Sequence, residues 1–163
     1  MASRAKEIPE GFHTVTPYLV VRDAAGAIDF YKQAFGAEEL FRIEGPPGKI
    51  GHAEIKIGDS IIMLSDEMQS GDCRSPQSLG GTAVNIFLYM EDVDRVFNQA
   101  VSAGAKVSMP LADMFWGDRL GQVTDPFGHS WSLATHKEDI PFDELKKRHE
   151  TAMAEMQCKE PVA

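Results

Sequence analysis

The sequence has few cysteines and no long apolar run. Its two cysteines, Cys73 and Cys158, lie in polar stretches, and neither belongs to a metal-binding or redox Cys-x-x-Cys spacing. We interpret both as incidental thiols. No apolar run approaches the roughly 20 residues that cross a bilayer, and the first ten residues contain no hydrophobic signal segment. The sequence therefore predicts no membrane as partner and a cytoplasmic location.

Basic residues are also scarce, which excludes another class of partner. Lys and Arg together number 16 against 25 Asp and Glu, so the formal net charge is −9. A protein that binds nucleic acid needs a clustered basic surface to neutralise phosphates, and no such cluster occurs here. A negative charge of this size favours solubility. We expect no nucleic acid as partner.

The first half of the chain carries one helix signal among several strand signals. Asp23 is a plausible N-cap, and apolar residues recur at helical spacing up to Gly36, which predicts an amphipathic helix over 24–35. β-rich segments predict strands over 14–21, 38–44, 50–57 and 60–66. Residues 67–81 are polar and rich in Gly and Ser, so they read as a linker or flap.

The same order of signals returns in the second half. Asp92 can cap a helix over 93–103, and strands are expected over 83–90, near 106–109, 119–124 and 130–135. Asp23 and Asp92 are 69 residues apart, and Gly36 and Gly104 are 68 apart. A repeated strand–helix–three-strand unit predicts an α+β fold, in which two tandem βαβββ modules form a curved mixed sheet around a cavity.

A further helix follows the second module. Residues 141–157 place apolar side chains along one helical face, and this face needs a groove on its own chain or on a partner chain. We therefore divide the chain into one domain over 1–136 and a C-terminal helix and tail over 137–163. Within the domain, module 1 spans about 14–66, the linker 67–81 and module 2 about 82–136.

The segment from Phe115 to Leu133 predicts two strands joined by a tight turn. Asp125-Pro126-Phe127-Gly128 supplies the turn, where Pro126 presets φ and Asp125 can accept hydrogen bonds from backbone amides two residues on. Aromatic and charged residues flank the turn on both sides. We interpret the segment as one wall of a ligand cavity.

With these motifs, the chain resembles the glyoxalase/bleomycin-resistance/dihydroxybiphenyl-dioxygenase superfamily, also called vicinal oxygen chelate proteins, and within it the PhnB-like branch. The residues that carry the resemblance are Thr16 to Val21, Asp29 to Ala37, His52-Ala53-Glu54 with Gly58-Asp59-Ser60, Phe115 to Arg119, and Asp125 to Trp131. The match covers roughly residues 14–136. The resemblance implies a bowl-shaped sheet from paired modules, often in a homodimer, with substrates or drugs bound in the concavity. Members include metal-dependent lyases, isomerases and dioxygenases, and also binding proteins that catalyse nothing.

The resemblance also tells where a metal site would lie. Metal-using relatives take ligands from the first and last strands of each module, and the matching positions here are Thr16, Asn85, Ser132 and either Ile62 or Met63. Hydroxyl, amide, aliphatic and thioether groups bind a divalent cation poorly compared with imidazole or carboxylate. We therefore expect no metal and no cofactor, which puts glyoxalase-type chemistry in doubt.

His52 and Glu54 are the candidate catalytic residues. They lie two apart on a predicted strand, so both point to one face. They either form a local hydrogen-bonded pair, or act on a ligand as acid and base, or take part in a relocated metal site to which His129 and His136 add nitrogen donors.

A second set of residues is expected to bind the ligand. The resemblance implies that Thr16, Met63, Asn85 and Ser132 face the cavity, and strand alternation then adds Tyr18 and Phe87 to the same faces. The aromatic and charged cluster adds Phe115, Trp116 and Arg119. For Trp116 and Trp131 core burial is the alternative, and for Arg119 it is an ion pair with Asp118 that pins the loop. Such a lining suits a planar or apolar small molecule.

The sequence thus predicts a PhnB-like homodimer that binds a small, largely apolar organic molecule without the standard metal site. The alternative is a metal-dependent lyase or dioxygenase with relocated ligands. Whether the protein is an enzyme stays open at this point. A methyltransferase is not expected, because no Gly-rich turn follows the first strand to hold a nucleoside cofactor.

Overall fold

The computed structural model describes residues 5–69 and 72–159, and only the backbone of residues 156–159. The predicted α+β fold of two βαβββ modules followed by a C-terminal helix is confirmed. The elements in chain order are β1 (Tyr18–Val21), α1 (Ala24–Phe35), β2 (Glu38–Glu44), β3 (Ile50–Ile57), β4 (Ser60–Asp66), α2 (Pro76–Leu79), β5 (Asn85–Tyr89), α3 (Val93–Ser102), β6 (Lys106–Asp113), β7 (Asp118–Thr124), β8 (Ser130–His136) and α4 (Phe142–Lys159).

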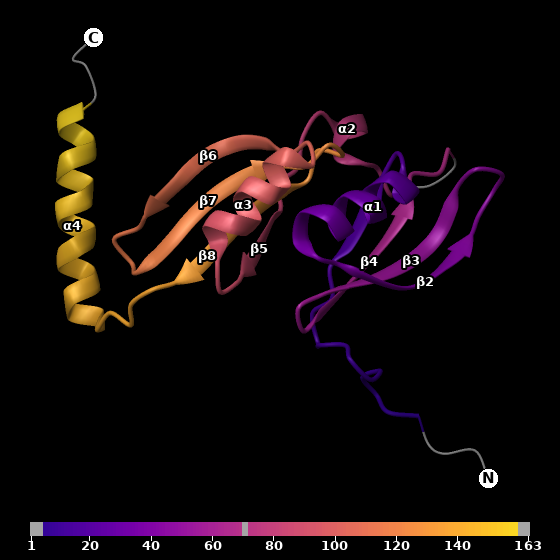
Figure 1. The fold of residues 1–163 in the computed structure, drawn as a ribbon, viewed down its shortest axis with the longest axis horizontal. Coiled ribbons are helices and arrows are strands. Elements are labelled where there is room, and N and C mark those ends of the chain that lie inside the picture. Colours follow the sequence, from indigo (N-terminus) through magenta and orange to yellow (C-terminus); the bar gives the residue numbers. More distant parts are fainter. Residues whose placement is uncertain (1–4, 70–71, 160–163) are drawn as a thin grey trace.

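Each module contributes one four-stranded sheet of the same topology (Figure 1). The strand orders are β1-β4-β3-β2 and β5-β8-β7-β6. In both sheets the first strand of the module pairs parallel with the last, and the other pairs are antiparallel. The parallel pair requires a crossover, and the helix that follows the first strand supplies part of it.

The repeat seen in the sequence extends to the hydrogen bonds at the helix starts. The side chains of Asp23 and Asp92 cap α1 and α3 by accepting from backbone amides of the first turn. The amide of Ala24 also donates to Asp66, and the amide of Val93 donates to Thr135. Donor and acceptor of the second bond each lie 69 residues after those of the first. Each helix is thereby fixed to the last strand of its own module.

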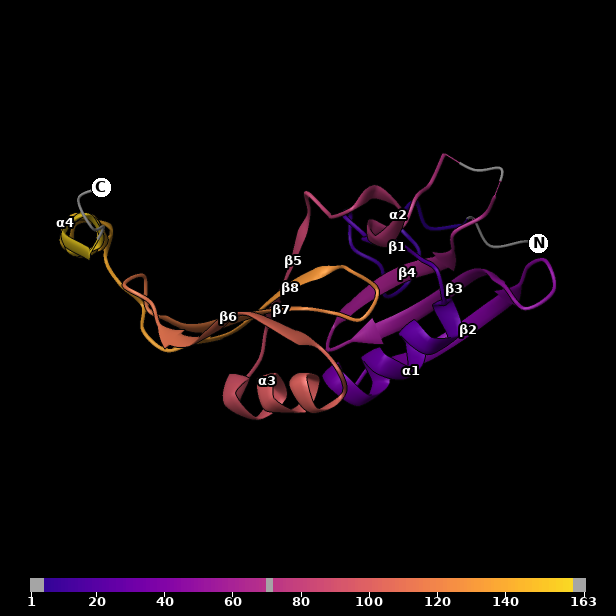
Figure 2. The same cartoon turned by 90° about the horizontal axis from the view of Figure 1, so that it is seen from above.

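The two helices cover one face of the sheets, and α1 and α3 also contact each other. Figure 2 shows them on the same side of the two sheets. A single core runs through both modules and includes Tyr31 and Ile28 of α1, Phe97 of α3 and Trp131 of β8. Because protein cores are close-packed, the shapes of these side chains fix the position of one module relative to the other.

Asp125 joins the two modules. Its carboxylate is buried and accepts from the backbone amides of Phe127 and His129, as the turn sequence predicts. Its other oxygen accepts from the Tyr31 hydroxyl of α1 at 2.8 Å and from Trp131 Nε1 at 2.9 Å. Burial, and next the Asp125 carboxylate, raise the pKa of Tyr31 well above its ordinary value, so this hydroxyl keeps its proton. One turn residue therefore ties α1 of module 1 to module 2.

The structure differs most from the sequence expectations in β1, in β6 and in the linker. β1 begins at Tyr18, so residues 14–17 are not part of the strand. β6 continues to Asp113 instead of ending near residue 109, and irregular pairing with β7 accompanies the extra length. The linker contains the short helix α2, which Ser75 caps and Pro76 begins. Ser75 followed by Pro76 is a helix-start signal. The linker is not predicted to contain a helix because its composition is polar and rich in Gly and Ser.

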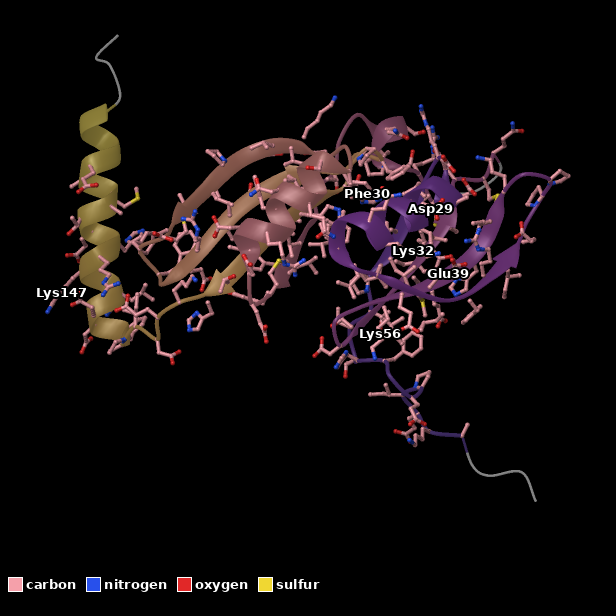
Figure 3. All side chains as sticks on the ribbon, in the orientation of Figure 1. Asp29, Phe30, Lys32, Glu39, Lys56 and Lys147 are labelled. Carbon is pink, nitrogen blue, oxygen red and sulfur yellow. The ribbon has the colours of Figure 1, made fainter. Side chains whose placement is uncertain are left out.

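The helix α4 extends away from the sheets (Figure 1). It meets the rest of the chain near its beginning, where Phe115 lies against His149 with ring centroids 5.4 Å apart and Arg148 pairs with Glu138. Figure 3 shows Lys147 on the side turned away from the sheets. Within the described part of the chain, no helix is long and apolar enough to cross a membrane.

The structure describes the side chain of one of the two cysteines. Cys73 is free and exposed in the linker. The side chain of Cys158 lies outside the described residues. The interpretation of both as incidental thiols stays a prediction.

Candidate functional site

Each sheet has one face without a helix, which we call its open face. On sheet β1-β4-β3-β2 this face carries Tyr18, with 48% of its surface exposed, and Phe41, with 43%. On sheet β5-β8-β7-β6 it carries Phe87, with 45% exposed, and Tyr89, with 64%. Large aromatic side chains are seldom left in water without a reason, so the open faces are the candidate binding surfaces.

The open face of module 1 holds a polar centre made by Tyr18, His52 and Glu54. The Tyr18 hydroxyl reaches over β4 to His52 Nδ1 at 3.2 Å. His52 Nε2 lies 3.5 Å from Glu54 Oε1. Only 26% of the His52 side chain and 12% of the Glu54 side chain are exposed. The alternation rule thus places this pair on one face, as expected.

Apolar groups surround this centre. The ring of His52 lies between those of Tyr18 and Phe41, with centroids 5.7 and 5.9 Å away. Met63 pairs with Tyr18 on one side and with Glu54 on the other, so it lies between them on the open face. The imidazole is therefore held in place by rings and by two polar partners.

The contacts of His52 fit one tautomer of the neutral imidazole. If Tyr18 donates to Nδ1, then Nε2 carries a proton and faces the Glu54 carboxylate. In that tautomer Glu54 accepts from Nε2 and orients the imidazole, and Tyr18 donates a hydrogen bond to Nδ1. Such an arrangement can bind a polar group of a ligand or exchange a proton with it.

The open face of module 2 is lined by the residues expected on β5 and β8. Asn85 donates from Nδ2 to the Ser130 hydroxyl at 2.8 Å. Phe87 and Tyr89 are neighbours on this face, with ring centroids 4.9 Å apart. Ser132 pairs with Phe87 and is buried beneath it. Thr16 lies before β1 on module 1, where its hydroxyl donates to the His13 carbonyl.

Asp118 and Arg119 do not form the ion pair that we considered. Arg119 pairs with Asp94 at 2.7 Å and with Asp113 at 3.2 Å. Asp118 is buried and pairs with His136 at 2.8 Å. Consecutive residues of a strand point to opposite faces, so Arg119 lies on the helix side and Asp118 on the open face. The structure therefore separates Arg119 from the other predicted ligand-binding residues.

Sequence reasoning missed the group of side chains around Asp118. Its carboxylate accepts from the Tyr89 hydroxyl at 2.9 Å, from Trp116 Nε1 at 3.0 Å and from His136. The expected strand began at residue 119, one residue too late, so alternation was never applied to Asp118. Had β7 been started at Asp118, alternation would have placed this carboxylate on the same face as His136 of β8.

The loop before β7 brings two aromatic residues to the edge of this face. Phe115 and Trp116 meet edge to face with centroids 4.9 Å apart. Trp116 keeps 37% of its surface exposed, whereas Trp131 is fully buried in the core. The two tryptophans thus have different environments, and only Trp116 is accessible to a ligand.

The residues at the standard metal positions do not suit a metal. Ile62 is buried against the helix side, and Met63 lies on the open face, so Met63 is the position that matches Ser132. The donor set is then Thr16, Met63, Asn85 and Ser132, which lacks imidazole and carboxylate. Nor do His129 and His136 join His52, because His129 Nε2 contacts the Val20 carbonyl and His136 contacts Asp118. Within residues 5–69 and 72–159, no three His, Cys, Asp or Glu side chains are grouped as metal ligands.

A hollow of about 500 Å³ lies between the modules. It is lined by Phe35, Ile57, Gly58, Asp59, Ser60, Phe87, Leu88, Tyr89, Met90, Arg95 and Val96. Of the predicted site residues, Phe87 lines it. Because the modules turn their open faces to the same side (Figure 2), the polar centre of module 1 and the aromatic residues of module 2 do not enclose one space within the chain.

Comparisons with known proteins agree with this fold. Residues 11–133 match the family model of the glyoxalase/bleomycin resistance protein/dioxygenase superfamily. A protein of Mycobacterium bovis is 49% identical over 135 residues, which cover 81% of this chain and 89% of that protein. TioX from Micromonospora sp. ML1 is 30% identical with a TM-score of 0.61, covering 76% of this chain and 98% of that chain. The PhnB protein from Bacillus cereus is 21% identical with a TM-score of 0.59, covering 76% and 99%, and shows the fold alone.

Proposed function

Because the chain belongs to the glyoxalase/bleomycin resistance protein/dioxygenase superfamily, we propose that it binds a small, largely apolar organic molecule on the open faces of its sheets. The observation that carries the proposal is the exposure of Tyr18, Phe41, Phe87 and Tyr89 on the open faces, beside polar groups that are held by hydrogen bonds. Flat aromatic rings with isolated hydrogen-bonding groups suit a planar organic ligand better than a phosphate.

On module 1 the polar end of the ligand would meet His52. This imidazole is held by Tyr18 and Glu54 and flanked by the ring of Phe41. If the bound molecule is transformed, His52 and Glu54 are the groups on this face that can move a proton to or from it. On module 2 the proposed contacts are Asn85, Phe87, Phe115 and Trp116, with Ser132 buried beneath Phe87, while Thr16 and Met63 complete the lining on module 1. We leave Arg119 out of the site, because Asp94 and Asp113 occupy its guanidinium on the helix side.

We propose further that a second copy of the chain closes the site. Within one chain both open faces stay exposed, because α1 and α3 lie together on their other side. A homodimer in which the open face of one chain faces that of its partner would enclose a ligand and would remove the aromatic side chains from water.

A thermal-shift screen with small organic molecules tests the binding function. A ligand present at a hundred times its Kd stabilises the native state by about 2.7 kcal/mol. For a chain of this length that corresponds to a rise in Tm of roughly 5–10 °C. If no molecule of a broad aromatic and apolar library raises the Tm, the proposal fails.

Substitution of His52 tests its place in the site. We expect His52→Gln to weaken the hits of the screen about fivefold, which corresponds to the loss of one hydrogen bond of about 1 kcal/mol. His13→Gln is the matched control, because His13 is exposed in the N-terminal arm. Unchanged affinities and unchanged turnover in His52→Gln would remove this residue from the site.

Metal analysis tests the absence of the standard site. We expect protein purified without chelators to carry less than one tightly bound divalent ion per chain, because the donor set lacks imidazole and carboxylate. A stoichiometric ion that is lost in Glu54→Ala would overturn this part of the proposal and would favour a metal-dependent enzyme.

A further inference from the structure

His136 and the buried Asp118 form a second polar centre, on the open face of module 2. Three donors converge on the Asp118 carboxylate, namely the Tyr89 hydroxyl, Trp116 Nε1 and His136 Nδ1, at 2.8–3.0 Å. Only 4% of Asp118 is exposed. These distances are shorter than those from His52 to Tyr18 and Glu54, which are 3.2 and 3.5 Å.

His136 is the one cation that balances this carboxylate. Among the residues that the structure describes, no Lys or Arg lies within ion-pair distance of Asp118, and the neighbouring Arg119 points to the helix side. A buried carboxylate without a counter-charge is costly, so the protonated form of His136 is favoured. The hydrogen bond to Asp118, followed by that to Asp139, raises the pKa of His136 above its usual range.

The second nitrogen of His136 is accessible to a ligand. Nε2 contacts Asp139 at 2.9 Å, and the Asp139 side chain is fully exposed. Half of the His136 side chain is exposed as well. An exposed ion pair contributes little to stability, so another acceptor can replace Asp139 at little cost.

Aromatic rings surround the same place. Tyr89 and Trp116 donate to the same oxygen of Asp118, and the ring of Phe87 lies against that of Tyr89. All three rings are partly exposed. A flat molecule that lies on these rings has its edge near His136, because His136 bonds to the other oxygen of the same carboxylate.

We propose that His136 is the anchor for an acidic oxygen of a planar aromatic ligand, a phenolate or carboxylate, that lies on Phe87, Tyr89 and Trp116. The protonated imidazole donates from Nε2 to that oxygen and Asp139 is displaced, while Asp118 holds the ring and balances its charge. This inference rests on the proposed binding function and specifies its ligand as an aromatic acid.

The proposal sets a pH dependence. Three titratable groups influence the imidazole of His136. They are Asp118 on β7, Asp139 after β8, and Tyr89 on β5, which acts through the Asp118 carboxylate. Binding of an aromatic acid is then strong while His136 is protonated and weakens as pH rises through its raised pKa.

The test compares naphthoate with its uncharged isostere naphthamide, by isothermal titration or ligand-observed NMR at about pH 6 on the full chain. We expect naphthoate to bind about tenfold more tightly than naphthamide, because a hydrogen bond to a charged group contributes about 1.5 kcal/mol or more. His136→Gln should abolish the preference, and the control His13→Gln should keep it. Asp139→Asn should strengthen naphthoate binding, because a neutral amide replaces the carboxylate that competes with the ligand for His136 and repels its charge.

Several outcomes overturn the inference. It fails if naphthoate shows no preference in the wild type, if His136→Gln retains the preference, or if Asp139→Asn weakens binding. If naphthamide binds but naphthoate has no advantage, the binding function stands and the anchor is wrong. If neither probe binds, nor any molecule of the thermal-shift library, both proposals fail. His136→Gln leaves Asp118 its bonds from Tyr89 and Trp116, and its Tm shows whether the variant is folded.

Discussion

Two buried aspartates organise this protein at the scale of single residues. Asp125 is surrounded by four donors that link α1 to the turn between β7 and β8. Asp118 is surrounded by three donors on the open face of module 2. Both are acceptors in places where water cannot compensate for a lost bond, but the first joins structural elements and the second holds a side chain at the surface.

We expect Asp125→Asn to lower the free energy of unfolding by about 3 kcal/mol. The amide can still accept from backbone, but its NH2 group faces Tyr31 and Trp131, whose buried donors then lose their acceptor. Urea denaturation should show a midpoint lower by roughly 1 M or more. Asp29→Asn is the control, since Asp29 is exposed on α1. A midpoint equal to that of this control would contradict the role given to Asp125.

At the scale of elements, charged side chains add to the contacts that fix α1 to its own sheet. In module 1 the edge strand β2 is joined to α1 through Glu39, which pairs with Lys32 of the helix (Figure 3). Glu39 also pairs with Arg42 of its own strand. The hydrogen bond from Arg42, and next that from Lys32, lower the pKa of Glu39 from 4.5 to about 2. This edge is therefore sensitive to acid.

The stabilisation that Glu39 provides should disappear in acid. Its folded pKa is depressed, so the contribution is complete above about pH 4.5 and is lost as pH falls toward about 2. We expect urea midpoints of Glu39→Gln to depend less on pH across this window than those of the wild type. Glu38→Gln, at the exposed neighbouring residue, should follow the wild type. Parallel curves for Glu39→Gln and wild type would count against the pairing.

At the scale of the whole molecule, the arrangement of the modules decides what the open faces can do. The aromatic contacts of Tyr31 and Phe35 with Trp131 hold the modules side by side, with ring centroids 5.3 and 4.8 Å apart. This contact uses the helix side of both modules. The open faces consequently stay exposed within one chain, which is the basis of the proposed ligand site and of the proposed dimer.

We expect a homodimer in solution. Light scattering should give twice the chain mass of 17.9 kDa at micromolar concentration, and the Tm should rise with protein concentration because association stabilises the folded state. A mass of one chain together with a concentration-independent Tm would reject the dimer.

The sequence by itself determined the modules, their strand and helix order, the caps at Asp23 and Asp92 and the shared face of His52 and Glu54. These features follow from local periodicity, capping and turn chemistry, which a chain carries without its tertiary contacts. Only the tertiary structure decided that Asp118 pairs with His136 rather than Arg119, that Asp125 reaches Tyr31, and that both open faces stay uncovered within one chain. These three outcomes depend on contacts between strands and helices that are distant in the sequence. Side-chain packing in the folded protein decides which of these elements meet, and the local sequence pattern carries no information on it.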